Sequence, residues 1–444
     1  MSVFARAAIA LLLTAGLPWT ARAEPVLMIS IDGLRPGDVI EAEQRGISVP
    51  NMRRVMLAGS YASGVRGSLP TLTRPSHLTL ITGVAPARHG ITDNEGFDPT
   101  GLNTMGWYWY ADDIKVPTLW DLVHAAGGTT ASISWPASVG SPNITYNFPD
   151  YPRDHDRSDP KLLRRLGGTS KAEAVDRAVG FDVGGRVGAS PCSDMAKAGF
   201  AAAIYALGKP RFFTIHLGEL DHVQHVHGPG SDEARAALHA VDAAVGTIVD
   251  AARRVEPDLV VVIVSDHGFA PTHHSVNLLR AFAQAGLLTL DPASHRIVTW
   301  RAAPWGGASV PIMLADPRDK ALKARTRALL DKLAADPANH IRRVIDAAGI
   351  ARMGGSPQAS FWVDFQSGYL AGGDPAGPMV QPTGTGGSHG YFPDQPEMNS
   401  AFFASGPGVP QRGDIGLIDQ RDIAPTVAGL LRIAMPDADG HAAF

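Results

Sequence analysis

The 444-residue sequence is nearly devoid of cysteine, with Cys192 as its only example. One cysteine excludes an intrachain disulfide, whatever the redox state of the compartment in which the protein works. Cys192 lies between Pro191 and Ser193, a setting typical of a loop or helix start. We therefore interpret it as a structural residue and not as a nucleophile.

Long apolar runs are also missing from the body of the chain, where none approaches the roughly 20 residues that a transmembrane helix needs. The N-terminus differs: Arg6 precedes an apolar stretch over residues 7–17, and residues 21–23 have the small-x-small pattern of a cleavage site. Residues 1–23 are thus predicted to be a secretory signal peptide, with an uncleaved anchor as the alternative. We expect a periplasmic or secreted protein without a membrane span after signal removal.

Charge is sparse and balanced, with 18% charged residues and a formal net charge of −4. This composition indicates neither a basic surface for nucleic acid nor a polybasic patch for anionic lipid. The 48 glycines and 34 prolines indicate many turns and ordered loops. No feature of the sequence indicates an oligomeric state, and no internal repeat of fixed period is present.

Short apolar runs alternate along the chain with amphipathic segments, which predicts an α/β fold with a mostly parallel sheet sandwiched by helices. The clearest buried strands are predicted at residues 26–31, 130–135, 212–217, 258–264 and 402–405, and the clearest helices at 117–126, 195–207, 233–255 and 423–431. The periodicity changes over about residues 141–193 and 275–380. Residues 24–444 are therefore predicted to form a single catalytic domain with two cap insertions.

Three carboxylates follow predicted strands. Asp32 comes directly after the strand at 26–31, Asp221 follows the strand at 212–217, and Asp266 follows that at 258–264. In an open α/β sheet, ligands bind at the carboxyl ends of the strands. We expect these three side chains to meet at one edge of the sheet.

Three histidines accompany these carboxylates. His225 comes four residues after Asp221 and shares its face of a helical turn, His267 directly follows Asp266, and His389 lies in a glycine-rich loop. Each alone has a structural explanation, such as a turn, a cap or a solvated loop. Together, mixed carboxylate and imidazole ligands suit Zn²⁺ best, with Mn²⁺ or Co²⁺ as substitutes.

A short helix is predicted to begin at Thr73, with Thr73 as its N-cap, Pro75 in its first turn and Gly83 as its stop. The N-terminus of a helix presents free N–H groups and the positive end of the helix dipole. The Thr73 hydroxyl is thus predicted to lie where an anion such as a phosphoryl group binds, although threonine is also a common cap without any catalytic role.

With these residues in place, the chain resembles the nucleotide pyrophosphatase/phosphodiesterase family of the alkaline phosphatase superfamily. The resemblance extends from Val26 to about Leu431 and implies an alkaline-phosphatase-like core. The matching motifs, in the family's order, are Ser30-Ile31-Asp32-Gly33, Thr73-x-Pro75-x-His77 with Leu80-x-Thr82-Gly83, His89-Gly90-Ile91 leading to Asn94, Trp135-Pro136, Asp221-His222-x-x-His225-x-x-Gly228-Pro229, Ser265-Asp266-His267-Gly268 and Gly387-x-His389-Gly390-Tyr391.

The resemblance implies a site with two zinc ions and a threonine nucleophile, Thr73, which would form a phospho-threonine intermediate. Asn94 would help the backbone N–H to bind a non-bridging phosphoryl oxygen. The ligands implied for the first zinc are Asp221, His225 and His389, and those for the second are Asp32, Asp266, His267 and the Thr73 oxygen.

Arg74 departs from the family pattern, because family members that grip a nucleobase commonly have an aromatic residue after the nucleophile. A guanidinium could instead bind a second phosphate or a carboxylate of the substrate bidentately. The aromatic cluster at residues 107–110 is interpreted as core or cap packing, with a second aromatic wall as the alternative.

The sequence therefore predicts a di-zinc hydrolase that cleaves phosphodiester or pyrophosphate bonds of a small-molecule phosphate ester. Two alternatives use the same site. One is a phosphonate hydrolase of the phosphonoacetate type, because those enzymes share the threonine and the metal motifs. The other is a catalytically silent, metal-binding homologue, against which the retention of Thr73 beside all of the ligands argues.

Overall fold

The computed structural model describes residues 24–103, 106–151, 166, 169–179 and 194–444. The predicted signal peptide and Cys192 lie outside the described residues, as does much of the predicted insertion at 141–193. Within the described parts of the chain, no helix combines the length and apolarity needed to cross a bilayer.

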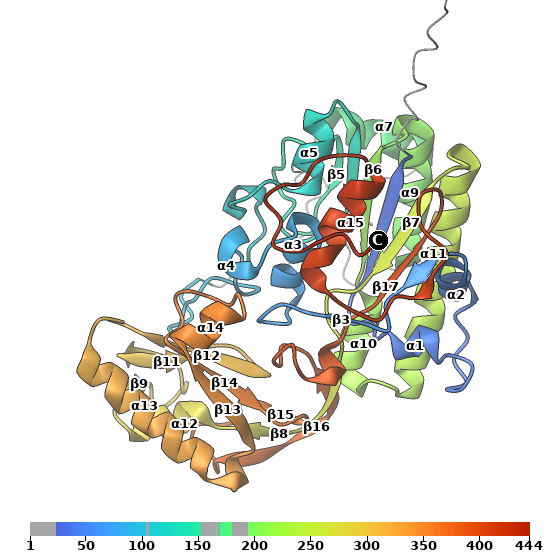
Figure 1. The fold of residues 1–444 in the computed structure, drawn as a ribbon. Helices are drawn as coiled ribbons and strands as arrows, with labels where there is room; N and C mark the ends of the chain where they lie inside the picture. Colours follow the sequence, from blue (N-terminus) through green and yellow to red (C-terminus); the bar gives the residue numbers. More distant parts are fainter. Residues whose placement is uncertain (1–23, 104–105, 152–165, 167–168, 180–193) are drawn as a thin grey trace, which may run out of the picture.

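An eight-stranded sheet forms the centre of the larger lobe (Figure 1). Its order is β18-β2-β17-β7-β1-β6-β4-β5, and neighbouring strands run parallel except where β17 pairs with β2 and with β7. The predicted α/β fold with a mostly parallel sheet is thus confirmed. The strands are β1 (Val26–Ile31), β2 (Ser60–Tyr61), β4 (Thr130–Ile133), β5 (Tyr146–Phe148), β6 (Phe212–Leu217), β7 (Val260–Val264), β17 (Phe402–Ser405) and β18 (Gly413–Asp414).

Helices cover both faces of this sheet, as the continuous burial of its central strands requires. Successive side chains of β1 face opposite ways: Leu27 and Ile29 share a core with α2, α9 and α11, whereas Val26 and Met28 share one with α3, α5 and α15. The helices of this lobe are α1 (Gly37–Ile40), α2 (Pro50–Leu57), α3 (Thr73–Thr82), α4 (Pro86–His89), α5 (Leu119–Ala125), α7 (Thr169–Val179), α9 (Asp194–Gly208), α10 (Glu219–His227), α11 (Asp232–Val255) and α15 (Ile423–Leu430).

The chain between β7 and β17 builds a second lobe with its own hydrophobic core, drawn in yellow and orange in Figure 1. An antiparallel sheet of order β11-β12-β14-β13 and a three-stranded sheet of order β15-β8-β16 form its framework. Its strands are β8 (Ala270–Val276), β9 (Leu288–Leu290), β10 (Ile297–Trp300), β11 (Ala302–Pro304), β12 (Ser309–Leu314), β13 (Ile341–Asp346), β14 (Phe361–Phe365), β15 (Tyr369–Ala371) and β16 (Val380–Ser388), and its helices are α12 (Leu278–Gln284), α13 (Lys320–Ala335) and α14 (Ala347–Arg352).

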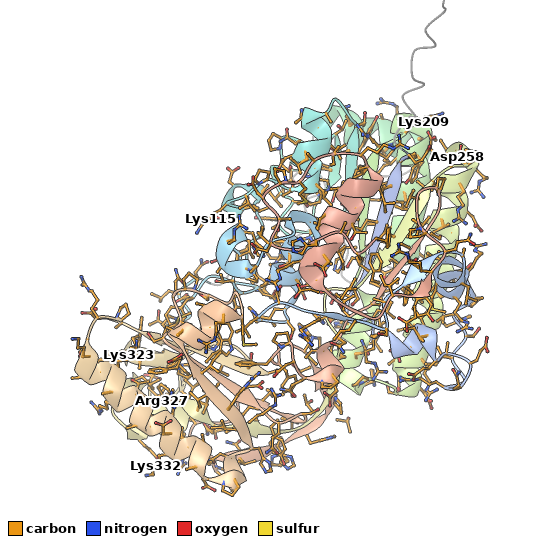
Figure 2. The ribbon with its side chains drawn as sticks, in the orientation of Figure 1. Lys115, Lys209, Asp258, Lys323, Arg327 and Lys332 are labelled. Atoms are coloured by element: carbon orange, nitrogen blue, oxygen red, sulfur yellow. The ribbon has the colours of Figure 1, made fainter. Side chains whose placement is uncertain are left out.

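Helix α13 shows how the second lobe buries one face and hydrates the other. Lys323, Arg327 and Lys332 point outward from it (Figure 2), whereas Leu322 and Leu330 are buried in the core of that lobe. The three- and four-residue spacing of its apolar positions is that of an amphipathic surface helix.

Candidate metal centre and active site

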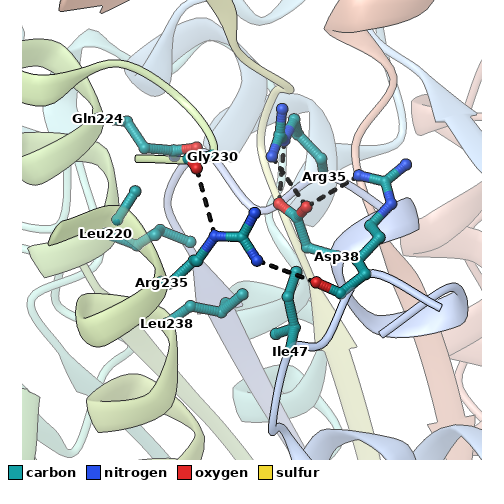
Figure 3. Close-up of a pocket in the computed structure, with 10 residues that line it drawn as sticks. Arg35, Asp38, Ile47, Leu220, Gln224, Gly230, Arg235 and Leu238 are labelled. Atoms are coloured by element: carbon teal, nitrogen blue, oxygen red, sulfur yellow. Dashed lines mark hydrogen bonds and ion pairs between the residues drawn. The ribbon is translucent and has the colours of Figure 1, made fainter. Parts of the chain in front are cut away.

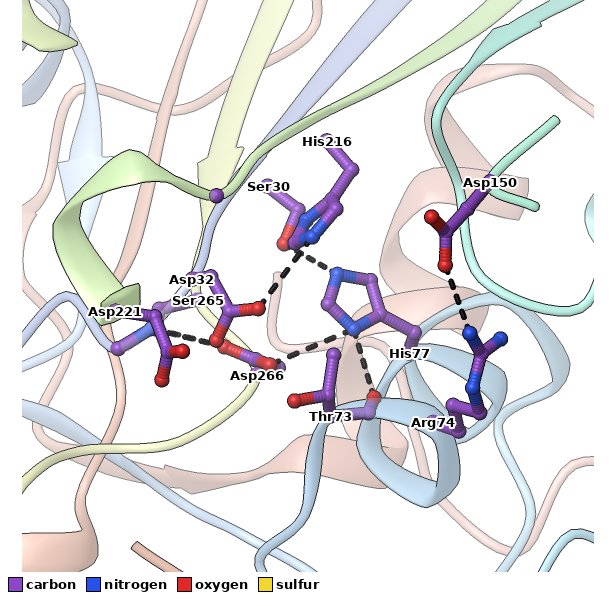
Figure 4. Close-up of polar contacts among 12 residues, drawn as sticks. Ser30, Asp32, Thr73, Arg74, His77, Asp150, His216, Asp221, Ser265 and Asp266 are labelled. Atoms are coloured by element: carbon purple, nitrogen blue, oxygen red, sulfur yellow. Dashed lines mark hydrogen bonds and ion pairs between the residues drawn. The ribbon is translucent and has the colours of Figure 1, made fainter. Parts of the chain in front are cut away.

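Three adjacent strands deliver the three carboxylates to one edge of the sheet. β1 lies between β7 and β6, so that Asp32 after β1, Asp266 after β7 and Asp221 on the first turn of α10 come together. Figure 4 shows them as a group facing Thr73. The structure thus brings together the three side chains that the strand pattern predicts to meet.

Asp221, His225 and His389 form one candidate metal-binding group, with one ligand atom from each lying within 4.8 Å of the others. The Asp221 carboxylate lies 3.4 Å from His225 Nε2 and 3.6 Å from His389 Nε2. His389 comes directly after β16, so the returning strand of the second lobe supplies this ligand to the core.

A second group of this kind contains Asp32, Asp221 and His267. His267 Nε2 lies 3.3 Å from Asp32 Oδ1, 3.1 Å from Asp266 Oδ2 and 3.4 Å from Thr73 Oγ1. Three of the four residues predicted for the second ion therefore surround the imidazole nitrogen of the fourth, His267. Asp221 belongs to both groups, which the sequence alone does not indicate.

The three imidazoles are oriented alike. Nδ1 of His225 lies 3.1 Å from the Gly387 carbonyl, Nδ1 of His267 lies 3.1 Å from that of Gly268, and Nδ1 of His389 lies 3.0 Å from that of Thr71. A carbonyl accepts only, so each Nδ1 carries the hydrogen and each Nε2 keeps a free lone pair. This arrangement fixes the tautomer and ring orientation that metal-bound histidines need.

Buried carboxylate oxygens at the site lack partners within the described protein. Asp32 Oδ1, Asp221 Oδ1 and Asp266 Oδ2 are buried and accept no hydrogen bond. Such oxygens are costly to bury unless a cation or a donor satisfies them. Three orphaned carboxylate oxygens facing three free Nε2 atoms fit a site for metal cations.

Burial and close contact between ionisable groups shift the pKa values of the residues in this centre. Burial and the neighbouring charges of Asp221 and Asp266 raise the pKa of Asp32 well above its ordinary value. Burial and the nearby His267 and His225 lower the pKa of His389 well below its ordinary value, so that this imidazole is neutral. Burial acts against the charged form of His267, but the Asp266 carboxylate outweighs it and raises the pKa of that imidazole. Crowded carboxylates beside the neutral His389 make a strong field for a cation.

The sequence predicts Thr73 as the N-cap of α3, but Thr73 is the first residue of the helix itself. Leu72 occupies the cap position, and the Thr73 hydroxyl makes no capping hydrogen bond. The side chain of Asn94 takes over that function, because its Oδ1 accepts from the Arg74 N–H at 2.9 Å. The Thr73 hydroxyl is thereby available to the carboxylate and imidazole cluster, and Asn94 is oriented with its amide nitrogen free to donate.

The Arg74 guanidinium lies on the opposite side of α3 from the Thr73 hydroxyl (Figure 4) and is only 2% exposed. It donates to Asp150 Oδ2 and to the Tyr108 carbonyl, both at 2.8 Å, and lies 4.0 Å from the ring centroid of Trp109. The predicted role of this guanidinium as a substrate ligand therefore has no geometric support. Arg74 instead joins the start of α3 to the aromatic cluster.

Behind the carboxylates, His77 and His216 form a buried pair that connects Thr73 to the sheet. His77 Nδ1 lies 2.7 Å from the Thr73 carbonyl, its Nε2 lies 2.8 Å from Ser30 Oγ, and its ring packs edge-on against His216 at 4.5 Å. His216 Nε2 lies 3.4 Å from Asp32 Oδ2. Because Nδ1 donates to a carbonyl, Nε2 accepts from the Ser30 hydroxyl, which ties the first turn of α3 to β1. His216 was missed because it lies within an apolar strand pattern.

The N-terminus of α10, which carries Asp221 and His225, is held by Asp194. This buried carboxylate accepts from the N–H groups of Gly218 and Glu219, at 3.2 and 3.1 Å, and from Lys197 Nζ at 3.0 Å. A negative charge at this end of a helix is favoured by the dipole and by the free N–H groups. Asp194 therefore fixes the helix on which two candidate ligands lie.

We expect Asp194→Asn to lower the free energy of unfolding by about 3 kcal/mol, because a buried charged pair loses one partner and α10 loses an acceptor. Chemical denaturation checks this value. The matched control is Asp232→Asn on the exposed first turn of α11, which should change stability by about 0.5 kcal/mol or less. Equal effects of the two variants would contradict the anchoring role of Asp194.

The outer side of α10 borders a hollow of about 170 Å³ lined by Arg35, Asp38, Arg235 and Gln224 among others (Figure 3). Its arginines are engaged within the protein: Arg35 pairs with Asp38, and Arg235 donates to the Gly230 carbonyl. Gln224 Nε2 donates to the Gly33 carbonyl at 3.0 Å. This hydrogen bond connects α10 to the loop that carries Asp32.

Comparison with known proteins finds similarity to phosphodiesterases and nucleotide pyrophosphatases. The model of the family described as type I phosphodiesterase / nucleotide pyrophosphatase matches residues 26–362. Human ectonucleotide pyrophosphatase/phosphodiesterase family member 1 is 26% identical over 254 residues, which are 55% of this chain and 23% of that protein. The venom phosphodiesterase CdcPDE of Crotalus durissus collilineatus is 26% identical over 252 residues, 55% of this chain and 26% of that protein.

Solved structures share the fold. Human ectonucleotide pyrophosphatase / phosphodiesterase 5 superposes with a TM-score of 0.65 at 18% identity, covering 94% of this chain and 97% of its own. The murine protein, in an inactive variant bound to AMP, gives the same TM-score at 17% identity and the same coverage. The chain spans only about a quarter of the length of the curated relatives named above. The match of the family model over most of the chain nevertheless confirms the resemblance seen in the sequence, and the chain belongs to the type I phosphodiesterase / nucleotide pyrophosphatase family of the alkaline phosphatase superfamily.

Proposed function

We propose that the protein is a metal-dependent hydrolase that cleaves phosphodiester or pyrophosphate bonds of small organic phosphates through a covalent intermediate on Thr73. The observation that carries the proposal is the Thr73 hydroxyl beside a cluster in which three Nε2 atoms and three orphaned carboxylate oxygens converge. The family supports the reaction class, and the AMP bound to the murine neighbour supports a phosphate ester as the ligand.

Two zinc ions are proposed as the cofactors. The first would be held by Asp221, His225 and His389, and the second by Asp32, Asp266 and His267 with the Thr73 oxygen. When bound, the ions would supply positive charge that favours the ionised Thr73 hydroxyl and the developing charge on the leaving oxygen. Mixed carboxylate and imidazole ligands favour Zn²⁺, and Mn²⁺ or Co²⁺ are the expected substitutes.

Thr73 and Asn94 have different roles in the proposed reaction. Thr73 Oγ1 loses its proton and bonds to phosphorus as the bond to the leaving oxygen breaks, and the leaving group takes up a proton. Asn94, held through its Oδ1 by the Arg74 N–H, donates from its amide nitrogen to a non-bridging phosphoryl oxygen. Water then displaces Oγ1 from phosphorus, which restores the threonine hydroxyl and releases the phosphate monoester.

The test compares bis(p-nitrophenyl) phosphate with p-nitrophenyl phosphate, using protein reconstituted with Zn²⁺. We expect kcat/KM to be higher for the diester, to fall to background after chelation and to return when Zn²⁺ is added. Product analysis on phosphonoacetate tests the phosphonate hydrolase alternative, which requires cleavage of the C–P bond. Bound zinc without turnover of any phosphate, phosphonate or sulfate ester would instead identify a silent homologue. Export to the periplasm or medium remains a prediction.

A further inference from the structure

A cavity of about 230 Å³ lies where the second lobe meets the candidate metal centre. Asn94, His225 and His389 border it on the side of the centre. On the side of the second lobe it is bordered by Gly307 of the loop between β11 and β12, Ser309 of β12 and Trp362 of β14. A substrate that reaches Asn94 therefore extends into a space whose far wall belongs to the second lobe.

The position of this cavity relative to Thr73 indicates which part of the substrate it holds. Thr73 Oγ1 lies beside His267, the imidazole that contacts Asp32 and Asp266. The cavity instead adjoins His225 and His389, which belong to the other group. In an in-line displacement the attacking and leaving oxygens lie on opposite sides of phosphorus. The cavity is thus on the side of the leaving group.

The charge of the cavity wall limits what that leaving group can be. Among the described residues that line the cavity there is neither lysine nor arginine, and its one acidic side chain is Asp93. The guanidinium of Arg74 is committed to Asp150 on the far side of α3. A leaving phosphate carries about two negative charges, which would lie beside Asp93 with no basic side chain to meet them.

The remaining wall is small and largely apolar, with Leu72, Gly306 and Ala308 among its residues. Such a surface accommodates an uncharged organic group. Burial raises the pKa of Asp93 to about 7, and its ionised form adds attraction for a positive group. We infer that this cavity selects phosphodiesters whose leaving group is an uncharged or cationic alcohol, and that it discriminates against pyrophosphate bonds. The inference rests on the proposed function, since it assigns the leaving group of that reaction.

The test uses compounds that share an adenosine 5′-phosphoryl group and differ in the leaving group, namely 2-aminoethanol, glycerol and phosphate (ADP). Each is assayed by AMP release and as an inhibitor of bis(p-nitrophenyl) phosphate hydrolysis. We expect the two alcohol esters to exceed ADP by about tenfold in kcat/KM, or in affinity as inhibitors. This order opposes intrinsic reactivity, because phosphate is the better leaving group of the three.

Gly307→Lys supplies the missing cation. The φ angle of Gly307 is not in the left-handed region, and a Cβ built on this residue meets no atom within 4 Å, so a side chain fits without a clash. We expect Gly307→Lys to shift the preference toward ADP by about fivefold relative to Gly307→Gln, which adds comparable bulk without charge. Asp93→Asn should shift the preference in the same direction and retain the oxygen that accepts the Asn94 N–H.

A wild-type preference for ADP, or equal shifts in the lysine and glutamine variants, would overturn the inference while leaving the proposed function in place, provided that bis(p-nitrophenyl) phosphate is hydrolysed. Loss of that basal reaction in the wild-type protein reconstituted with Zn²⁺ would refute the proposed function itself, and with it the assignment of a leaving group.

Discussion

Thr73→Ala is expected to lower kcat/KM for bis(p-nitrophenyl) phosphate by about 10³-fold or more, because it removes the nucleophile of the proposed reaction. The same variant should alter the free energy of unfolding by no more than about 0.5 kcal/mol, because the hydroxyl does not cap α3. A capping threonine would cost about 1 kcal/mol when replaced by alanine. The expected result is therefore a large loss of activity in a protein of unchanged stability.

Thr73→Ser is the matched control, since it keeps an oxygen nucleophile and should retain measurable turnover. Acid quenching during turnover, followed by mass spectrometry of the peptide that contains Thr73, should trap the phosphoryl adduct in the wild-type protein but not in the alanine variant. Survival of the full rate in Thr73→Ala would show that water attacks phosphorus directly. In that case the hydroxyl near His267 would be a bystander to the reaction.

The placement of Asp32, Asp221, His225 and Asp266 was predictable from the sequence because it follows from local rules. Asp32 and Asp266 come after short apolar runs that are typical of buried strands, and parallel strands end at one edge of a sheet. Asp221 and His225 share a helix face because they are four residues apart. Such placements depend on where a strand ends and on the periodicity of a helix. Both are determined by residues that are close together in the sequence.

Contacts between segments far apart in the chain were not predictable in this way. Asp150 lies 76 residues from Arg74, and its carboxylate draws the guanidinium away from the site where it was expected to act. Asn94 replaces Thr73 as the acceptor at the start of α3, although it comes from a separate loop. Asp194 holds α10 from the start of another helix. Each of these contacts depends on tertiary packing, which residue spacing does not encode.

Asp221 lies in both candidate metal groups, so its replacement should have the widest effect on the centre. We expect Asp221→Asn to lose most of its bound zinc and to lose the rise in melting temperature that Zn²⁺ gives the wild-type protein. Activity should fall to background together with the metal. Zinc content by mass spectrometry and thermal unfolding with and without chelator measure both effects, and Asp232→Asn serves as a control on the exposed surface.

Without metal, the same substitution should stabilise the fold. Burial, together with the charge of Asp266, raises the pKa of Asp221 even though His225 and His267 act in the opposite direction. A carboxyl whose pKa is raised by folding destabilises the protein above its folded pKa, and this penalty disappears as the pH falls below the value in the unfolded chain. In chelator at pH 7, the free energy of unfolding of Asp221→Asn should therefore exceed that of the wild type by about 1 kcal/mol, and the difference should vanish near pH 4.

A variant that is less stable than the wild type both in Zn²⁺ and in chelator would show that Asp221 supports the fold directly. The crossing of the two stabilities, with wild type ahead in Zn²⁺ and the variant ahead in chelator, is the behaviour expected of a carboxylate whose burial is compensated by a metal ion.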